Sequence, residues 1–110
     1  MGDTRTWDQV GRLVQWLDKN AEPASQADVT LLRVLKIGEE YGEVAEALHG
    51  AMGANPRKGR SHSWNDVQTE LADVIVTSMV ALATVAPDAD RVLQERLEAL
   101  VTRVTPGQAD

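Results

Sequence analysis

The chain has 110 residues, of which 43% are hydrophobic and 25% are charged, a composition typical of one folded domain and not of a disordered segment. Acidic residues outnumber basic residues by 17 to 11, and the net charge of −6 argues against binding to a nucleic-acid polymer, which needs a basic surface. The absence of cysteine excludes disulfide frameworks, zinc ribbons and thiol nucleophiles.

The N-terminal residues are polar and lack the basic-then-apolar pattern of a secretion signal. The most apolar stretch, residues 71–86, contains Asp73 and three hydroxyl side chains and is shorter than the roughly 20 residues that cross a bilayer. We therefore expect a cytoplasmic protein without a membrane partner, folded as a single helical domain over residues 1–110.

Apolar residues recur at helical spacing along the chain and predict an all-α protein without strands. The absence of phenylalanine supports this prediction, because small sheet proteins usually draw on aromatic pairs. The expected helices span roughly residues 7–20, 28–50, 63 or 65 to 86, and 88–104, with a frayed tail at 105–110.

Capping residues mark three of these helix starts. Thr6 and Gln9 form a capping-box pattern before the first helix, and Ser25 begins a similar pattern before the second. Either Ser63 or Asn65 can cap the third helix.

Four glutamates follow one stripe of the second predicted helix: Glu39, Glu40, Glu43 and Glu46. At about 100° per residue the stripe is about 120° wide, with Lys36 in its midst. Like charges at this spacing destabilise a helix by about 0.2–0.5 kcal/mol per pair. A solvated acidic face is the ordinary explanation of such a run. The opposite side carries Gly38 and Gly42, which predict the close approach of another helix.

The third predicted helix is apolar nearly all round, except for a narrow strip with Glu70, Asp73 and Thr77. Such a helix is usually buried by its neighbours, so we expect both acids to face an interior or a cleft. A buried carboxylate needs a partner, either an arginine of the first or fourth helix or a cation shared with the second helix. Carboxylate oxygens suit magnesium, manganese or calcium. A shared metal site accounts for both acidic groups at once, and we favour it.

The segment between these two helices, residues 50–63, is basic. It contains Gly50, Gly53 and Gly59, so we expect the second helix to break at Gly50. It carries Arg57, Lys58, Arg60 and His62 and no acid. Such side chains are commonly solvated. Beside metal-binding carboxylates, however, they could neutralise the phosphates of a polyphosphate substrate.

Two motifs together resemble the MazG-like all-α nucleoside triphosphate pyrophosphohydrolases. The family signature has two adjacent glutamates, a third glutamate three residues later, and a Glu-x-x-Asp pair on the next long helix. Here these are Glu39, Glu40 and Glu43, followed by Glu70 and Asp73. The similarity is closest across residues 31–82.

The resemblance implies a four-helix bundle whose second and third helices carry the acidic site, assembled as a homodimer or homotetramer. It also implies magnesium-dependent cleavage of a nucleoside triphosphate between the α- and β-phosphates, with manganese as a substitute metal. Carried over by position, the metal ligands are Glu40, Glu43, Glu70 and Asp73. Glu39 matches the first glutamate of the signature and would bind the metal or deprotonate the attacking water.

Four further residues are candidates for nucleotide binding: Lys36, Arg57, Lys58 and Trp64. Lys36 could instead form an ion pair with Glu40, and Trp64 could serve packing alone.

Two other readings stay open. Glu46 and His49 form one Glu-x-x-His element of the kind that di-iron bundles use twice, but the second copy is missing, so His49 is expected in a core or interface. The chain could also be a non-catalytic helical interaction module that binds metal or nucleotide.

Overall fold

The computed structural model describes residues 4–105 and is entirely helical over that range, apart from one isolated bridge between Asn55 and Gly59. Its four helices are α1 (Thr4–Asn20), α2 (Gln26–Met52), α3 (Trp64–Val85) and α4 (Ala89–Val104). The predicted all-α, four-helix arrangement is therefore confirmed. Most of the tail predicted at 105–110 lies outside the described residues.

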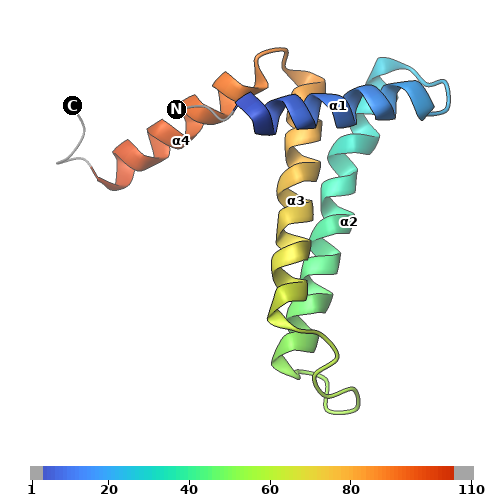
Figure 1. Ribbon diagram of the computed structural model, residues 1–110, viewed down its shortest axis with the longest axis vertical. Coiled ribbons are helices and arrows are strands. Elements are labelled where there is room, and N and C mark those ends of the chain that lie inside the picture. Colours follow the sequence, from blue (N-terminus) through green and yellow to red (C-terminus); the bar gives the residue numbers. More distant parts are fainter. Residues whose placement is uncertain (1–3, 106–110) are drawn as a thin grey trace.

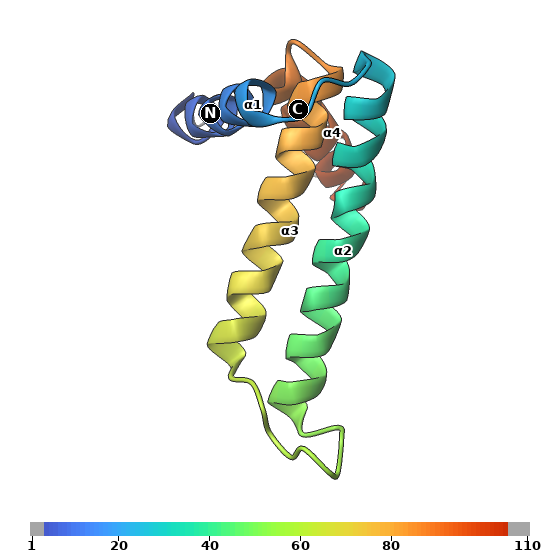
Figure 2. The same ribbon diagram turned by 90° about the vertical axis from the view of Figure 1, so that its right-hand side faces the viewer.

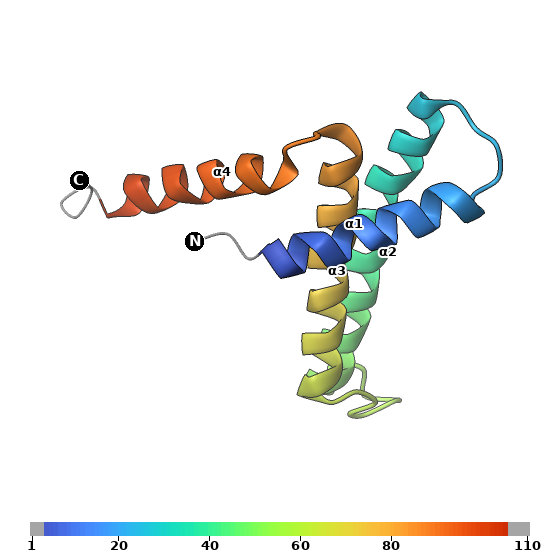
Figure 3. The ribbon, with the colours of Figure 1, turned by 45° about the horizontal axis from the view of Figure 1, so that its top comes forward.

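The longest helices, α2 and α3, pack side by side as an antiparallel hairpin (Figures 1 and 2). Helix α1 crosses this hairpin near the end that is remote from the connecting loop, where it contacts α3. Helix α4 begins at the same end and extends away from the hairpin (Figure 3). The loop between α2 and α3 thus lies at the opposite end of the molecule from α1 and α4.

Two small apolar clusters hold the helices together. Near the α1 crossing, Val10 of α1 packs against Met79 and Val80 of α3. Toward the connecting loop, Ala47 and Ala51 of α2 pack against Val67 of α3. The second cluster is built mostly from alanine, which lets the backbones of α2 and α3 approach closely.

A polar link joins the three helices at the α1 end. The Arg33 guanidinium on α2 donates to the Asp18 carboxylate of α1 at 2.7 Å and to the Thr84 hydroxyl of α3 at 3.0 Å. Only 12% of the Arg33 side chain is exposed, so its donors are committed to these contacts instead of water.

The capping predictions are confirmed for two helices and wrong for one. The Ser25 hydroxyl accepts from the Asp28 N–H at the start of α2. Ser63, and not Asn65, caps α3 in a reciprocal capping box with Asp66. Hydrogen bonding from the Ser63 N–H is the main reason that the pKa of Asp66 lies below its ordinary value. Helix α1 begins by Thr4, so Thr6 lies inside its first turn and is not the N-cap.

The predicted break at Gly50 is wrong, because α2 continues to Met52 and ends at Gly53. Gly53 adopts a left-handed φ of 64°, the conformation that favours glycine at a helix C-terminus. Gly50 has a different role. A Cβ atom placed there would lie 2.1 Å from His62 Nδ1 and 2.6 Å from Ser61 Oγ. The absence of a side chain at Gly50 therefore lets the loop fold back onto α2.

The expected burial of α3 on all sides is wrong for this chain alone. Leu71 is 47% exposed and Ile75 is 60% exposed. The cause is the arrangement of the helices, since α1 covers only the end of α3 remote from the loop and α4 turns away. Gly38 and Gly42 face open space as well, so the predicted close approach of another helix to them does not occur within residues 4–105.

Helix α3 is also the one helix within residues 4–105 that is long and apolar enough, by length and composition, to cross a membrane. Core helices of soluble proteins meet the same criterion. In this chain the helix carries Glu70 and Asp73 within its apolar surface.

We expect the Gly50→Ala substitution to lower the free energy of unfolding by about 1–3 kcal/mol, because the new Cβ overlaps the His62 ring. Gly11→Ala is a matched control inside α1, where nothing lies within 4 Å of the added Cβ. It should stabilise the protein by about 0.5–1 kcal/mol through helix propensity. Urea unfolding followed by circular dichroism measures both. A Gly50→Ala protein as stable as the Gly11→Ala protein would contradict the tight contact.

Candidate metal centre

Three carboxylates from two helices meet on one side of the hairpin. Glu40 of α2 and Glu70 and Asp73 of α3 each present one oxygen within 4.8 Å of the others. Glu70 and Asp73 share a face because they are three residues apart on a helix, and the antiparallel packing places Glu40 opposite them. This is the only group of three potential metal ligands of this kind among residues 4–105.

The electrostatics of this acidic triad (Glu40, Glu70 and Asp73) are unfavourable without a counter-charge. The pKa of Glu70 is raised, first by desolvation and then by the negative charges of Asp73, Glu43 and Glu40. Folding thus favours a protonated Glu70. The contribution of Glu70 to the free energy of unfolding is fully present at pH values below the pKa that Glu70 has in the unfolded chain. It is lost as the pH rises through the raised pKa of the folded state.

No arginine relieves this repulsion within residues 4–105. Arg33 is engaged with Asp18 and Thr84, and Arg91 pairs with Asp88 and Glu95. No ion pair within residues 4–105 joins an arginine to Glu70 or Asp73, and no arginine contributes to the pKa shift of Glu70. The arginine partner considered from the sequence is therefore absent from this part of the chain.

Lys36 supplies the one nearby positive charge. Its Nζ lies 3.5 Å from Glu40 Oε1, one helical turn away on α2, as the ion-pair alternative predicted. The Glu40 side chain is 18% exposed and that of Lys36 is 56% exposed, so such a pair contributes little to stability. Lys36 therefore offsets only part of the negative charge of Glu40.

Glu43 and Glu39 are not members of the triad. Glu43 is exposed, but its carboxylate lies near enough to Glu70 to raise the pKa of that residue. Glu39 is exposed on α2 immediately before Glu40. The role of Glu43 as a metal ligand and the role of Glu39 as a catalytic base stay predictions.

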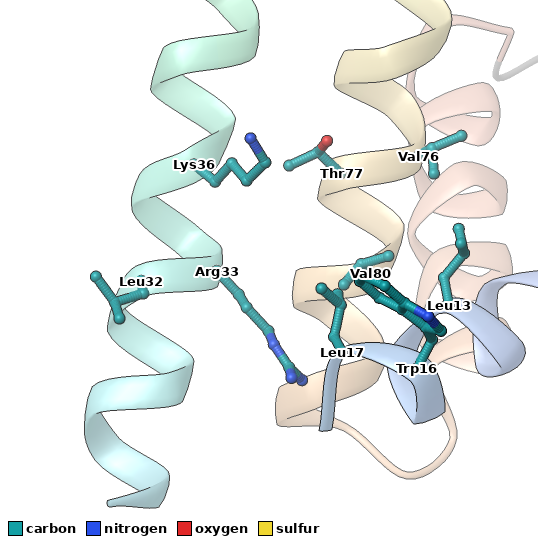
Figure 4. A pocket seen from close by; sticks show the side chains of 9 residues that line it. All are labelled: Leu13, Trp16, Leu17, Leu32, Arg33, Lys36, Val76, Thr77 and Val80. Atoms are coloured by element: carbon teal, nitrogen blue, oxygen red, sulfur yellow. The ribbon is translucent and has the colours of Figure 1, made fainter. Parts of the chain in front are cut away.

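An apolar pocket of about 340 Å³ adjoins the triad between α1, α2 and α3 (Figure 4). Lys36 and Thr77 point toward one another across its opening, and the aromatic ring of Trp16 lies at its α1 side. Lys36 also pairs with Glu40, and Thr77 follows Asp73 by one helical turn. The pocket therefore begins one helical turn from the triad on both α2 and α3.

The loop residues predicted to bind phosphate lie at the far end of the hairpin. Lys58 lines a second pocket there, whereas the Arg57 side chain is exposed and only its backbone N–H is engaged, by Asn55 Oδ1. Trp64 begins α3 and is 56% exposed, about 9 Å along the helix axis from Glu70. The structure does not bring Arg57 or Trp64 to the triad.

His49 is not a core residue, because it is exposed and lines the same loop-end pocket as Lys58. The predicted core position is therefore wrong, because no helix within residues 4–105 covers that side of α2 at His49. An interface position, the other part of the prediction, stays a prediction.

Sequence patterns alone missed Trp16 and Arg33 as pocket residues. The apolar spacing of Leu13, Trp16 and Leu17 identifies one face of α1, but it does not say which helix that face meets. Arg33 acts through partners 15 and 51 residues away, which no local pattern reveals. Thr77, by contrast, was visible in the polar strip with Glu70 and Asp73.

The donor set of the triad fits a hard divalent cation. It offers oxygen ligands only, in a partly exposed position where water can complete the coordination shell, as magnesium prefers. A cation between the three carboxylates would also remove the repulsion that raises the pKa of Glu70.

Comparisons with known proteins give no relative: no family model, no curated protein sequence and no solved structure matches this chain.

We expect Asp73→Asn to weaken Mg²⁺ binding at least about tenfold, since even partners outside the ligand shell are worth 10–100-fold in metal sites. Glu46→Gln is the matched control, because it removes one charge from the same acidic face of α2 outside the triad. Isothermal titration calorimetry compares the two proteins. An equal loss of Mg²⁺ affinity in both variants would mean that Mg²⁺ binding depends only on the overall charge of the surface.

Mg²⁺ binding should also weaken as the pH falls through the raised pKa of Glu70, because proton and metal compete for the same carboxylate. Calorimetry in buffers of different ionisation enthalpy, at pH values near the pKa of Glu70, measures the protons released. An affinity that does not change between neutral and acidic pH would remove Glu70 from the site.

Proposed function

We propose that this chain is a cytoplasmic, magnesium-dependent nucleoside triphosphate pyrophosphohydrolase, which releases a nucleoside monophosphate and pyrophosphate. The observation that carries the proposal is the acidic triad adjoining a pocket that is apolar, aromatic on one side and edged by Lys36. Such a combination suits a ligand with a flat apolar end and a charged phosphate end. The two glutamate motifs on α2 and α3 support the same proposal.

The pocket supplies the part of the site that an isolated metal centre lacks. Its volume, about 340 Å³, falls in the range of small-molecule sites. Trp16 offers a face on which a nucleobase can stack, and Thr77 offers a hydroxyl for a sugar or phosphate oxygen. Lys36, held by Glu40 at the edge, can turn toward a phosphate because its side chain is more than half exposed.

The cation would be held by Glu40, Glu70 and Asp73, with Glu43 as an additional ligand. When bound, magnesium polarises a phosphoryl group and lowers the pKa of a coordinated water. In the proposed reaction Glu39 accepts a proton from the attacking water. The oxygen of that water bonds to the α-phosphorus, the bond from the α-phosphorus to the bridging oxygen breaks, and pyrophosphate leaves with the electron pair.

The Glu39→Gln variant should keep Mg²⁺ and nucleotide binding but lose turnover by a factor of about 10²–10⁴, the usual contribution of a general base. Glu22→Gln is a matched control on the exposed linker before α2 and should retain full activity. Single-turnover kinetics on a nucleoside triphosphate measures the rate. Equal rates in both variants would exclude Glu39 as the base.

Product analysis with a panel of nucleoside triphosphates tests the reaction class. We expect pyrophosphate and the monophosphate in equal amounts, with no orthophosphate. Diphosphate plus orthophosphate would contradict the proposed bond cleavage. Tight nucleotide binding without any hydrolysis would favour the non-catalytic binding module.

A further inference from the structure

A second polar pocket, of about 310 Å³, lies at the loop end of the hairpin and has no part in the proposed hydrolysis. Both histidines of the chain line it, His49 from α2 and His62 from the loop, together with Lys58 and Ser61. Glu46, also in its lining, is six residues from Glu40, or about 9 Å along α2 from the acidic triad.

The loop is ordered around this pocket by its own hydrogen bonds. The Asn55 carbonyl accepts from the N–H groups of Lys58 and Gly59, and Asn55 Oδ1 accepts from the Arg57 N–H. Gly59 adopts a left-handed φ of 63°, which allows the tight turn. Lys58 is thereby turned to the pocket while Arg57, next to it, is not.

The position of His62 is fixed by two contacts. Its ring lies so close to Gly50 that a Cβ there would be 2.1 Å from Nδ1, and Nδ1 is 3.0 Å from Ser61 Oγ. Nε2 of the half-buried ring is left as the atom available to a ligand. Gly50 and the Ser61 hydroxyl therefore hold the imidazole in one orientation.

We propose that this loop-end pocket binds a phosphate group. Its lining provides one permanent cation, Lys58, two imidazoles that become donors when protonated, the Ser61 hydroxyl and the Asn55 amide. The only acid in the lining is Glu46, so the ionisable side chains around this pocket are mostly basic. The proposal does not depend on hydrolysis, because no residue of the triad takes part.

The probe is inorganic pyrophosphate, added to the metal-free full-length protein in the presence of a chelator at pH 6.5, near the ordinary pKa of histidine. Nuclear magnetic resonance follows the two imidazoles, assigned with His49→Ala and His62→Ala. We expect saturable shifts of both signals and about tenfold weaker binding in Lys58→Ala. Arg57→Ala, the matched control one residue away, should bind like the wild type.

Absence of saturable shifts with both pyrophosphate and a nucleoside triphosphate, or equal weakening in Lys58→Ala and Arg57→Ala, would overturn the proposal. Binding that persists in Asp73→Asn supports a pocket separate from the triad, and its loss there would overturn the separation. A parallel titration with a nucleoside triphosphate distinguishes the sources: shifts with both probes identify a site for free anions, and shifts with the nucleotide alone identify its phosphate tail.

An independent observation concerns the surface of the chain. Its accessible area is 8499 Å², whereas a compact protein of this mass exposes about 6,000 Å². The radius of gyration, 17.4 Å, likewise exceeds the about 13 Å of a compact domain of this length. The excess area, about 2,500 Å² per chain, is of the size that one partner buries in an obligate dimer.

Exposed apolar side chains follow one face of α4. Four of its apolar side chains fall at spacings of four, three and four residues, which forms one stripe along the helix: Leu93, Leu97, Leu100 and Val104. All four are exposed, with Leu97 52% exposed, because α4 leaves the hairpin. The stripe continues into an apolar groove between Leu93 and the exposed Ile75 of α3.

The resemblance already implies a homodimer or homotetramer, and we infer that the α4 stripe and the adjoining α3 groove form the contact between its copies. A second copy is the occupant that matches the excess area, because a symmetric contact buries the same apolar surface on both chains. Light scattering at micromolar concentration should give at least twice the chain mass of 12.0 kDa.

Leu97→Glu should lower that mass to a monomer at the same concentration. Thr102→Glu introduces the same charge on the opposite side of α4 and should leave the mass unchanged. Circular dichroism confirms that both variants remain helical. A wild-type mass of 12.0 kDa would overturn the inference, and a Leu97→Glu protein of unchanged mass would remove α4 from the interface.

Discussion

Three carboxylates held within 4.8 Å of one another are the constraint on which the site depends. Such a group is stable only because apolar contacts elsewhere in the hairpin fix α2 against α3. The alanine-lined cluster joins α2 to α3 on the loop side of the triad. On the other side, Val10, Met79 and Val80 pack α1 against α3, and Arg33 links α2 to both of these helices. The packing energy of these clusters therefore maintains a concentration of negative charge that the side chains alone would not adopt.

The position of the triad along the hairpin gives it two different neighbours. Toward α1 lies a pocket that is apolar and aromatic, with Lys36 between it and Glu40. Toward the loop lies a polar pocket whose ionisable lining is mostly basic. A divalent cation at the triad would thus lie between a surface suited to an apolar ring and a surface suited to anions. This order along the hairpin matches the order of base and phosphates in a nucleotide.

The helices and two of the three predicted caps were predictable from the sequence because they depend on local patterns; the Thr6 cap was wrong. Ser25 and Ser63 cap the helices they precede, and Glu70 and Asp73 share a face as their spacing requires. Gly50 was misjudged because its role depends on His62, twelve residues further on. The burial of α3 was misjudged for a related reason, since periodicity shows that a face is apolar but not whether the same chain covers it.

The same limit applies to the site. Sequence spacing grouped Glu70 with Asp73, and the family resemblance added Glu40 and Glu43, but the packing of α2 against α3 brings only Glu40 of these two into the triad. It also places Lys58, and not Arg57, in a pocket, a distinction decided by the turn at Gly59. Adjacent residues of like charge can be separated in this way only by backbone geometry.

The central claim is that the acidic triad is a cation site. Its most direct test is the crystal structure of the protein grown with Mn²⁺, using anomalous scattering to locate the metal. The account predicts an anomalous peak about 2.0–2.3 Å from carboxylate oxygens of Glu40, Glu70 and Asp73, in an oxygen-rich shell completed by water. A peak elsewhere with an empty triad, or no peak at saturating Mn²⁺, would contradict it.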